Sequence, residues 1–419
     1  HDRDGKIGAF QVVRAKAALR EADEIDARKD KTDLLLAGVP VAIKDNVAVA
    51  GEPMRVGSLG SDAAPQPRDH DIVRRLRAAG AVVVGITRVP ELCVFGATDS
   101  AFGITHNPWD LDRTPGGSSG GAAAAVASGM VPIAHGNDGM GSIRIPSACC
   151  GLVGLKPGLG VLPAGIGNGD WFGMAENGPI ATTVQDAATV FAVMADVRPF
   201  VNVRRPNHVR IATSTRAPML GTPVDKHWRA AVGKAGLLLR EAGHTVEADD
   251  PPYSIRTLVS EIGRWSAGTE LDAQLLADRS RLERRLKSFT KLGRRAMKLG
   301  LAGPEGRARW QRAAESFFEE HDVLITPTLA QPPIRSVAWG QRGMVANIWS
   351  NSHYAPFAAP WNLAGWPAMA VPAGVHPTGT PLSVQLVTKP GGEMTLLGLA
   401  GVLEGAQPWP RIAPGYADA

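Results

Sequence analysis

Short apolar runs alternate with segments of helical periodicity along most of this chain, and this alternation limits the folds that it can adopt. Runs at 38–43, 81–87 and 131–135 are too short for buried helices and are bounded by Gly or Pro, as is typical of buried strands. Residues 71–79 and 223–242 instead place apolar side chains three or four positions apart, as in helices with one buried face. Strands that alternate with helices predict a layered α/β protein.

The same pattern covers the rest of the chain with one long interruption. Further strands are predicted at 209–213, 322–326, 367–371 and 382–387, and further helices at 10–28 and 392–404. Between about 250 and 320 the sequence is helical and rich in Arg, and it has no strand pattern. We interpret this region, 250–320, as a helical insertion within one large domain that spans residues 1–419.

Much of the positive charge of the chain is concentrated in one stretch. Residues 279–298 contain nine Lys or Arg and one acid, Glu283, so this stretch carries +8 and leaves −3 of the formal net charge of +5 to the rest. The body of the protein is therefore no polycation, and no nucleic-acid partner is expected. A solvated helix that buries Leu282, Leu286 and Phe289 explains the stretch, with docking to an acidic partner or a membrane surface as the alternative.

The three cysteines, Cys93, Cys149 and Cys150, argue against a disulfide framework, because their number is odd and two of them are adjacent. No run of about 18 apolar residues predicts a membrane span, and the polar start of the chain is unlike a signal peptide. A cytoplasmic location is therefore expected. The histidines lack the spacing of a metal site such as H-E-x-x-H, so we expect neither a metal nor a cofactor.

A serine lies in the first of two Gly-rich segments, at 116–121. This segment formally matches the G-x-S-x-G elbow of α/β-hydrolases, but that elbow needs a strand directly before the serine, and residues 107–115 form a loop. A flexible linker is also excluded, because an Ala-rich helix at 122–127 follows at once. The glycines therefore indicate tight backbone geometry inside the body of the protein.

The second Gly-rich segment, 136–142, also ends in a serine. Clustered glycines can turn consecutive backbone N–H groups toward one anion. A dinucleotide-binding loop would have the order G-x-G-x-x-G, whereas this segment has G-x-x-G-x-G and is followed by Pro146. An oxyanion hole beside a nucleophilic serine explains these features better.

Three motifs in order carry a resemblance. GVPVAIKDN at 38–46, GGSSGG at 116–121, and the GNDGMGSIRIP segment at 136–146 that leads into GLVGLKP at 151–157 resemble the amidase signature family. The separations also fit that family, with 74 residues from Lys44 to the first serine and 24 between the two serines. The resemblance implies one α/β/α domain whose mixed, mostly parallel central sheet is flanked by helices.

The resemblance also implies a catalytic triad. Ser142 is the expected nucleophile, and Lys44 is the expected base, which works only if burial lowers its pKa enough to make it neutral. Ser118, joined to Gly117 by a cis peptide bond in this family, passes a proton between them. Backbone N–H groups of the second loop form the expected oxyanion hole: Gly139, Met140, Gly141 and Ser142.

Other residues of these motifs have supporting roles in the prediction. Asp138 and Arg144 are expected to brace the loop rather than take part in bond cleavage, and Ser119 supports the first loop. Met140 departs from the family, which usually has two glycines before the nucleophile. If this position needs a positive φ angle, Met140 is strained there; alternatively, its side chain reshapes the acyl pocket.

The segment after the GLKP motif lines the pocket in this family, and here it includes Trp171, Phe172 and Met174. If these side chains are not simply core, they favour small aryl or alkyl amides, with esters or carbamates as further substrates of the same acyl-enzyme route. Two alternatives stay open. One is the glutaminase subunit of a tRNA-dependent amidotransferase, although the Ser-rich stretch usual there is missing. The other is a non-catalytic binding protein with the same fold. A homodimer is common among such enzymes.

Overall fold

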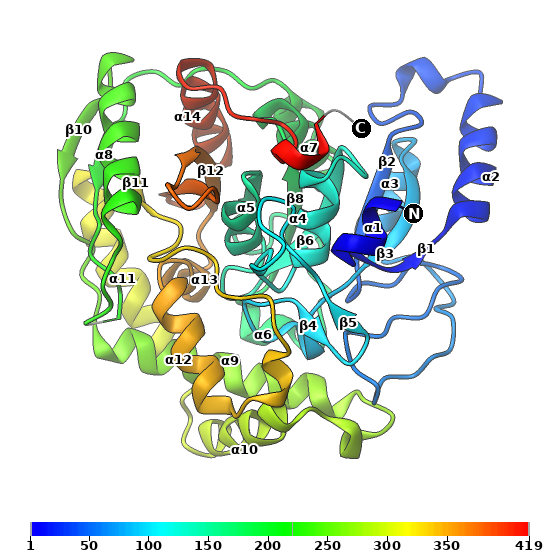
Figure 1. The fold of residues 1–419 in the computed structure, drawn as a ribbon. Coiled ribbons are helices and arrows are strands. Elements are labelled where there is room, and N and C mark those ends of the chain that lie inside the picture. The colour runs from blue at the N-terminus through cyan, green and yellow to red at the C-terminus, as the bar shows by residue number, and fades with distance from the viewer. Residues whose placement is uncertain (1, 220, 418–419) are drawn as a thin grey trace.

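The computed structural model describes residues 2–219 and 221–417, which form a layered α/β structure around one long sheet (Figure 1). In that part of the chain, eleven strands join in the order β1-β3-β2-β6-β8-β7-β12-β13-β11-β9-β10, and a separate hairpin pairs β4 with β5. The strands are β1 Phe10–Val13, β2 Pro40–Lys44, β3 Val82–Thr87, β4 Asp99–Ser100, β5 Gly103–Ile104, β6 Ile133–Asp138, β7 Val153–Lys156, β8 Glu176–Ala181, β9 Arg210–Thr213, β10 Thr245–Ala248, β11 Val323–Pro327, β12 Ala368–Val375 and β13 Pro381–Thr388.

The sheet is mixed, as predicted, and its parallel pairs lie toward the two ends. β3, β2 and β6 run parallel to one another, as do β11, β9 and β10. The pairs from β6 to β11 through the centre, and the edge pair of β1 with β3, are antiparallel. Parallel pairing is thus less extensive than in the mostly parallel sheet that was expected. The reason is that the strands at the centre, in the order β8-β7-β12-β13, all pair antiparallel with their neighbours.

Helices cover both faces of the sheet. They are α1 Asp2–Ile7, α2 Ala15–Asp26, α3 Asp71–Ala78, α4 Gly120–Ala127, α5 Arg144–Cys150, α6 Asp170–Gly173, α7 Val184–Ala195, α8 Lys226–Glu241, α9 Ile255–Gln274, α10 Arg284–Lys298, α11 Pro304–Glu320, α12 Met344–Tyr354, α13 Ala359–Ala364 and α14 Glu393–Ala406. One row, α3-α7-α14-α8, packs side by side against the sheet, and α4 and α5 pack together against its centre. Every residue of α4 and α5 is buried, so the candidate site is built on the most enclosed helices of the fold.

The predicted elements are mostly found where expected, with exceptions that have physical causes. The helix predicted at 10–28 is wrong over its first four residues, because Phe10–Val13 form β1 and pair with the edge of β3. The sequence prediction also missed β7, β8 and β10. β8 reads ENGPIA, which has neither an apolar run nor alternation, yet all six residues are buried between β6 and β7.

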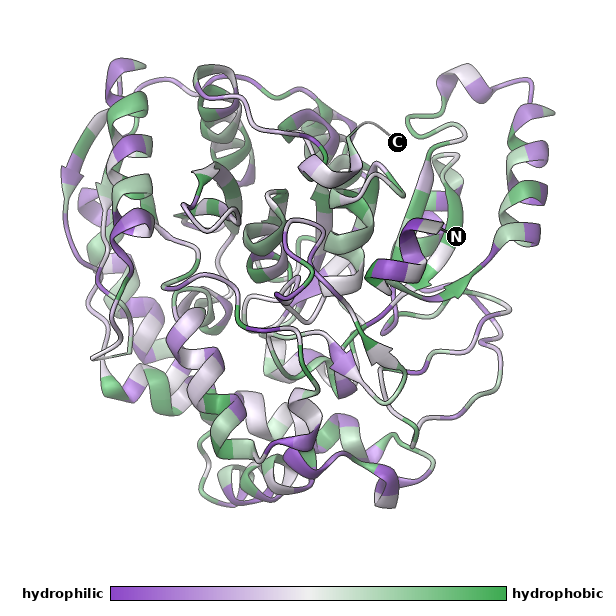
Figure 2. Cartoon of the chain, viewed as in Figure 1, coloured by the Kyte–Doolittle hydropathy of each residue, from purple (hydrophilic) through white to green (hydrophobic). Residues whose placement is uncertain are grey.

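The Arg-rich region is helical, as its pattern predicted, and it forms α9, α10 and α11. In the view of Figure 1, α9 and α10 lie at the bottom and α11 lies at the left side. Leu282, Leu286 and Phe289 are buried, while hydrophilic side chains are frequent along α10 (Figure 2). Part of the positive charge is used inside the protein, because Arg285 is fully buried and pairs with Asp99 at 3.0 Å. Among the described residues, no helix is both long and apolar enough to cross a membrane.

Candidate active site

The candidate site forms where two parallel strands end side by side. β2 pairs with β6 in parallel, with Val41 opposite Ile133, so the carboxyl ends of both strands reach the same edge of the sheet. Lys44 is the last residue of β2, and Asn137 and Asp138 are the last residues of β6. The strand pairing therefore brings the predicted base next to the Gly-rich loop that follows β6.

Lys44 is fully buried and its ammonium nitrogen has three short contacts. The Lys44 Nζ atom lies 2.7 Å from Ser118 Oγ, 2.7 Å from Asn137 Oδ1 and 3.2 Å from the Asn137 carbonyl oxygen. Asn137 is itself held in place, because its Nδ2 donates to Asn46 Oδ1 at 2.6 Å. These contacts fix the lysine on the hydroxyl of Ser118, as the sequence motif predicted.

Burial also changes the protonation of this lysine. Removal from water lowers the pKa of Lys44 to about 8, while the electrostatic influence of Cys93 and Asp138 acts in the opposite direction. A lysine with such a pKa loses its proton far more readily at neutral pH than one in solution. Lys44 can therefore supply a neutral amine to accept a proton from Ser118.

Ser118 lies in the loop before α4, and its peptide bond with Gly117 is cis, as the resemblance implied. Ser118 is 1% exposed. The neighbouring Ser119 ties this loop to the second one, because its N–H donates to the Ser142 carbonyl oxygen at 3.2 Å. In the described part of the chain no hydrogen bond joins the hydroxyls of Ser118 and Ser142, although both line the same cavity.

The loop from Gly139 to Ser142 leaves most of its backbone donors unused. Within residues 2–219 and 221–417, the N–H groups of Gly139, Met140 and Ser142 have no acceptor. The N–H of Gly141 does have one, since it donates to Asp138 Oδ1 at 2.6 Å. Three of the four expected oxyanion donors are thus available, and the fourth is engaged in shaping the loop.

Met140 is accommodated without backbone strain. The positive φ angle in this loop belongs to Gly141, at 110°, and Met140 is not among the residues with positive φ. Its half-buried side chain packs against the apolar cluster that contains Phe95 and Trp265. Of the two interpretations of Met140, the structure therefore excludes strain and places the side chain where it can shape a cavity.

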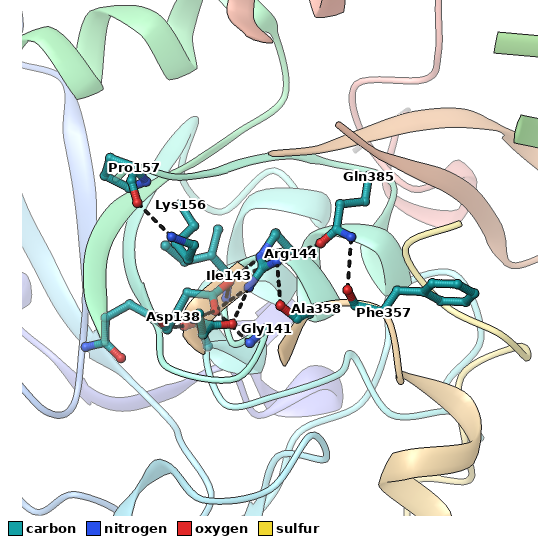
Figure 3. Close-up of polar contacts among 12 residues, drawn as sticks. Asp138, Gly141, Ile143, Arg144, Lys156, Pro157, Phe357, Ala358 and Gln385 are labelled. Carbon is teal, nitrogen blue, oxygen red and sulfur yellow. Dashed lines mark hydrogen bonds and ion pairs between the residues drawn. The ribbon is translucent and has the colours of Figure 1, made fainter. Parts of the chain in front are cut away.

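A buried polar network braces this loop (Figure 3). Asp138 accepts hydrogen bonds from the backbone of Gly141 and Ile143 and forms an ion pair with Arg144, whose Nε and Nη2 lie 2.9 Å from its carboxylate oxygens. Both side chains are fully buried. Burial alone would raise the pKa of Asp138, but the charge and hydrogen bonds of Arg144 hold it well below its usual range.

The network continues to the neighbouring strand and helix. Arg144 Nη1 donates to Gln385 Oε1 at 2.6 Å and to the Ala358 carbonyl oxygen at 3.0 Å, and Asn362 Nδ2 donates to Asp138 Oδ1 at 2.9 Å. Arg144 thus ties the loop to residues more than 200 positions away in the sequence. Asp138 and Arg144 have the bracing contacts that the sequence analysis expected.

Two cavities meet at Ser142. The first, here called the Trp171 cavity, has a volume of about 230 Å³ and is lined by Ser118, Ser142, Trp171 and Asp272, among others. The second, the Glu261 cavity, has a volume of about 80 Å³ and is lined by Met140, Ser142 and Glu261, among others. Ser142 is 8% exposed, so a group bound in either cavity would lie beside its hydroxyl.

The comparisons with known proteins agree with this geometry. A family model described as Amidase matches residues 2–397. The chain belongs to the amidase family. Over 428 residues it is 44% identical to the protein named "Putative amidase AmiB2" of Mycobacterium bovis. The matched region covers 99% of this chain and 92% of that protein.

Two solved structures share the fold of this amidase. The structure of 6-aminohexanoate cyclic dimer hydrolase matches with a TM-score of 0.85 and 28% identity, over 97% of this chain and 91% of its own. A bacterial aryl acylamidase of the amidase signature family matches with a TM-score of 0.82 and 25% identity, over the same shares of the two chains. Together these relatives support hydrolysis of an amide bond as the reaction class of this amidase.

The three predicted pocket residues have different positions. Trp171 lines the Trp171 cavity, and its Nε1 donates to Asp272 Oδ2 at 2.6 Å. Met174 is 1% exposed in the core, and Phe172 is half-buried with its carbonyl oxygen bound by Arg264. Neither Phe172 nor Met174 is among the residues that line either cavity.

Sequence analysis also missed several residues at the site of this amidase. Cys93 lines the Trp171 cavity beside Ser118, in a backbone conformation with φ 57°, and burial raises the pKa of its thiol to about 11. It is therefore a neutral thiol rather than a second nucleophile. Asn137 could have been found from its place next to Asp138 in the motif. Asp272 and Glu261 had no sequence signal, since both lie in the variable helical region.

One group of side chains could hold a metal ion, away from both cavities. Asp225, His227 and His376 place ligand atoms within 4.8 Å of one another, at the start of α8 and after β12. Among the described residues this is the one such group of three His, Cys, Asp or Glu side chains. None of the three lines the Trp171 cavity or the Glu261 cavity.

Proposed function

We propose that this amidase hydrolyses small aryl or alkyl amides through an acyl-enzyme on Ser142, with esters and carbamates as further substrates. The observation that carries the proposal is the 2.7 Å contact between Lys44 Nζ and Ser118 Oγ, formed by a lysine whose pKa burial has lowered to about 8. A serine hydroxyl needs an adjacent base to attack an amide, and this pair supplies one next to Ser142.

The reaction has two stages. Ser142 Oγ attacks the substrate carbonyl carbon while its proton passes to Ser118, and the proton of Ser118 passes to the neutral Lys44 amine. The unused N–H groups of Gly139, Met140 and Ser142 would stabilise the negative oxygen of the tetrahedral intermediate. The C–N bond then breaks as the leaving amine takes a proton back through Ser118. Water releases the acyl group by the same route in reverse.

A histidine base is disfavoured by the surroundings of His135, the histidine that directly precedes the GNDGMGSIRIP motif. His135 Nδ1 lies 3.4 Å from the backbone N of Lys44, and Nε2 lies 2.9 Å from Asn177 Oδ1. Burial lowers the pKa of His135 to about 3, so the ring is neutral. With both ring nitrogens engaged inside the protein, His135 supports the strand ends rather than Ser142.

The surroundings of Ser142 support a compact, largely apolar substrate. The Trp171 cavity presents the apolar side chains of Trp171, Val56, Leu92 and Leu276, and its polar lining includes Asp62 and Asp272. Apolar walls with a small number of placed polar groups are typical of sites for small molecules. The solved relatives that act on an aryl acylamide and on a cyclic amide have the same fold, which adds support for this substrate class.

The test is hydrolysis of a chromogenic panel, an anilide, an aryl ester and an aryl carbamate, by the wild type and by Ser142→Ala. Ser142→Ala should lower kcat by at least about 10³-fold on every substrate that the wild type turns over, because the variant lacks the hydroxyl that forms the acyl-enzyme. Ser288→Ala, on the exposed side of α10, is the matched control and should retain wild-type rates. Equal rates for wild type and a folded Ser142→Ala would exclude Ser142 as the nucleophile.

A further inference from the structure

Glu261 lines the Glu261 cavity from helix α9 and has no partner for one of its carboxyl oxygens. The side chain is 4% exposed, and Glu261 Oε1 is buried without a hydrogen bond to any described residue. Buried polar atoms in native proteins nearly always have a partner, and an exception needs an explanation. Since Ser142 and Met140 line the same cavity, the explanation concerns the candidate active site.

The other groups around the cavity do not supply a partner. Apart from Glu261, its lining consists of apolar residues, glycines and the neutral Ser142, Asn351 and Ser352. The Asn351 side chain is engaged, because its Oδ1 accepts from the Gly96 N–H at 2.6 Å. Arg264, one turn further along α9, donates instead to the carbonyl oxygens of Phe172 and Gly303.

Another glutamate of the same helix, Glu270, has the charged partners that Glu261 lacks among the described residues. Glu270, which is 1% exposed, pairs with Arg279 at 2.8 Å and with Arg294 at 2.9 Å. No described residue supplies such a cation to Glu261, and burial raises the pKa of its carboxyl to about 8. Asp272, a third carboxyl group of α9, lines the Trp171 cavity, and it accepts hydrogen bonds from the Asn168 N–H and from Trp171 Nε1. Glu261 therefore differs from both other carboxyl groups of this helix, because one of its oxygens is buried inside a cavity without any partner among the described residues.

We propose that the Glu261 cavity binds a part of the substrate that carries a basic nitrogen, an alkyl amine, and that Glu261 is its partner. This inference rests on the proposed amide hydrolysis at Ser142 and specifies its substrate class. The cavity is small and its lining is mostly apolar apart from Glu261, so it fits a short methylene chain that ends in an amine. Met140, which lines the cavity together with Ser142, contacts the chain.

An amine fits better than the other polar groups that a substrate could bring. A substrate carboxylate would be repelled by Glu261, and a hydroxyl would provide a hydrogen bond but no opposite charge. An amine that enters as the free base takes the proton of the Glu261 carboxyl group, and the two become an ammonium–carboxylate pair with no proton lost to water. Charge-assisted hydrogen bonds of this type are about twice as strong as neutral ones.

The test compares matched anilides and amides that differ in one terminal group. One series has an ω-amino or a methyl terminus at the end of the acyl chain, and a second series has the same pair of termini on the leaving amine. In the wild type, kcat/KM should favour the amine over the methyl terminus at least tenfold in one of the two series. In Glu261→Gln and Glu261→Leu this preference should fall at least tenfold, and Glu261→Asp should retain part of it.

Glu270→Gln, a change of a paired carboxylate on the same helix, is the control and should keep the preference. Methyl-terminated substrates report on the proposed function separately, because their hydrolysis should depend on Ser142 whatever occupies the Glu261 cavity. If the wild type hydrolyses them but shows no amine preference in either series, or if the preference persists in Glu261→Gln, the inference about Glu261 is wrong. If Ser142→Ala leaves their hydrolysis unchanged, the proposed function fails first.

Discussion

Two buried carboxyl groups, Asp138 and Glu261, border the candidate active site of this amidase and have opposite surroundings. Asp138 accepts hydrogen bonds from its own loop and pairs with Arg144, and its pKa is held well below its usual range. Glu261 is almost as deeply buried, but in the described part of the chain no cation pairs with it, and burial raises its pKa to about 8. Burial alone therefore does not decide the charge of a carboxyl group here; the partner does.

The different environments of Asp138 and Glu261 suit two different roles around Ser142. The loop that we propose as the oxyanion hole must keep one shape, and a charge neutralised inside the protein provides a rigid support for it. A substrate cavity must leave a group free for what enters, and a neutral carboxylic acid without a partner fits that need. Buried ionisable groups with strongly shifted pKa values often mark functional sites, but only the unpaired one has bonding capacity left for a ligand.

The largest effect should follow removal of the charge that the protein neutralises. In Asp138→Asn, Arg144 would remain buried without its counter-ion, which typically costs about 3–5 kcal/mol in the free energy of unfolding. Glu261→Gln, the same chemical change in the lining of the Glu261 cavity, should lose no comparable stability. Urea denaturation of both variants measures this contrast. Equal losses in the two variants would show that the environments differ less than the contacts indicate.

A methyl group at Gly141 tests the shape of the loop that Asp138 holds. Gly141 has φ 110°, and an added Cβ would lie 2.6 Å from the Cβ of Ala358. Gly141→Ala should therefore displace the neighbouring N–H groups and lower kcat about 10²-fold, the range found for loss of one oxyanion donor. Gly160→Ala is the matched control, because Gly160 has φ 79° but an added Cβ meets nothing within 4 Å. A similar loss of kcat in both variants would point to general destabilisation instead.

The pH profile of hydrolysis reports on Lys44, whose pKa burial lowers rather than raises. Only the neutral amine accepts a proton, so the rate should rise about tenfold per pH unit below the pKa and level off above about 8. The sign follows from the base acting in its deprotonated form. Measurement of kcat/KM for a neutral anilide from pH 5 to 10 locates the inflection. A flat profile over this range would argue against Lys44 as the base.

Glu261 should also make the stability of the protein depend on pH. Its folded-state pKa lies above the unfolded value of about 4.3, so the native state holds the proton more tightly. The stability of the wild type should consequently fall as pH rises from about 4 to about 8, by at most about 1.4 kcal/mol per pH unit. Glu261→Gln lacks this titration. The unfolding free energy of Glu261→Gln minus that of the wild type should therefore increase with pH across that window. A constant difference would contradict this prediction.

The sequence predicted the part of this site that local patterns encode. The apolar run before Lys44 and the two Gly-rich loops placed the predicted base and both serines, and strand pairing of β2 with β6 brings them together. Each feature depends on residues close in the chain, so its pattern is visible without the fold. The pairing of Gly141 N–H with Asp138 was not visible, because it depends on the path of the loop in three dimensions.

The rest of the site depends on long-range packing, and the sequence could not predict it. Glu261 and Asp272 lie on α9, within the helical region whose docking position no periodicity reveals. Arg144 reaches Gln385 and Ala358, contacts that only the folded sheet creates. The buried strand β8 escaped prediction for a related reason, since its burial comes from both neighbouring strands rather than from its own composition.

The smallest effect is expected at Met140, which belongs to the loop braced by Asp138 and also lines the Glu261 cavity. Because Met140 has no positive φ, a glycine there relieves no strain, and kcat for Met140→Gly should stay within about threefold of the wild type. The variant removes one side chain from the lining of the Glu261 cavity. Glycine also gives the unfolded chain more conformational freedom, which lowers the free energy of unfolding by about 0.5–1 kcal/mol. KM should therefore rise a few-fold for substrates that fill this cavity and stay constant for a short acetyl anilide. Steady-state kinetics on both substrates separates kcat from KM. A tenfold gain in kcat would instead mean that Met140 restrains the proposed oxyanion loop. Lining the Glu261 cavity would then be a secondary role of this side chain.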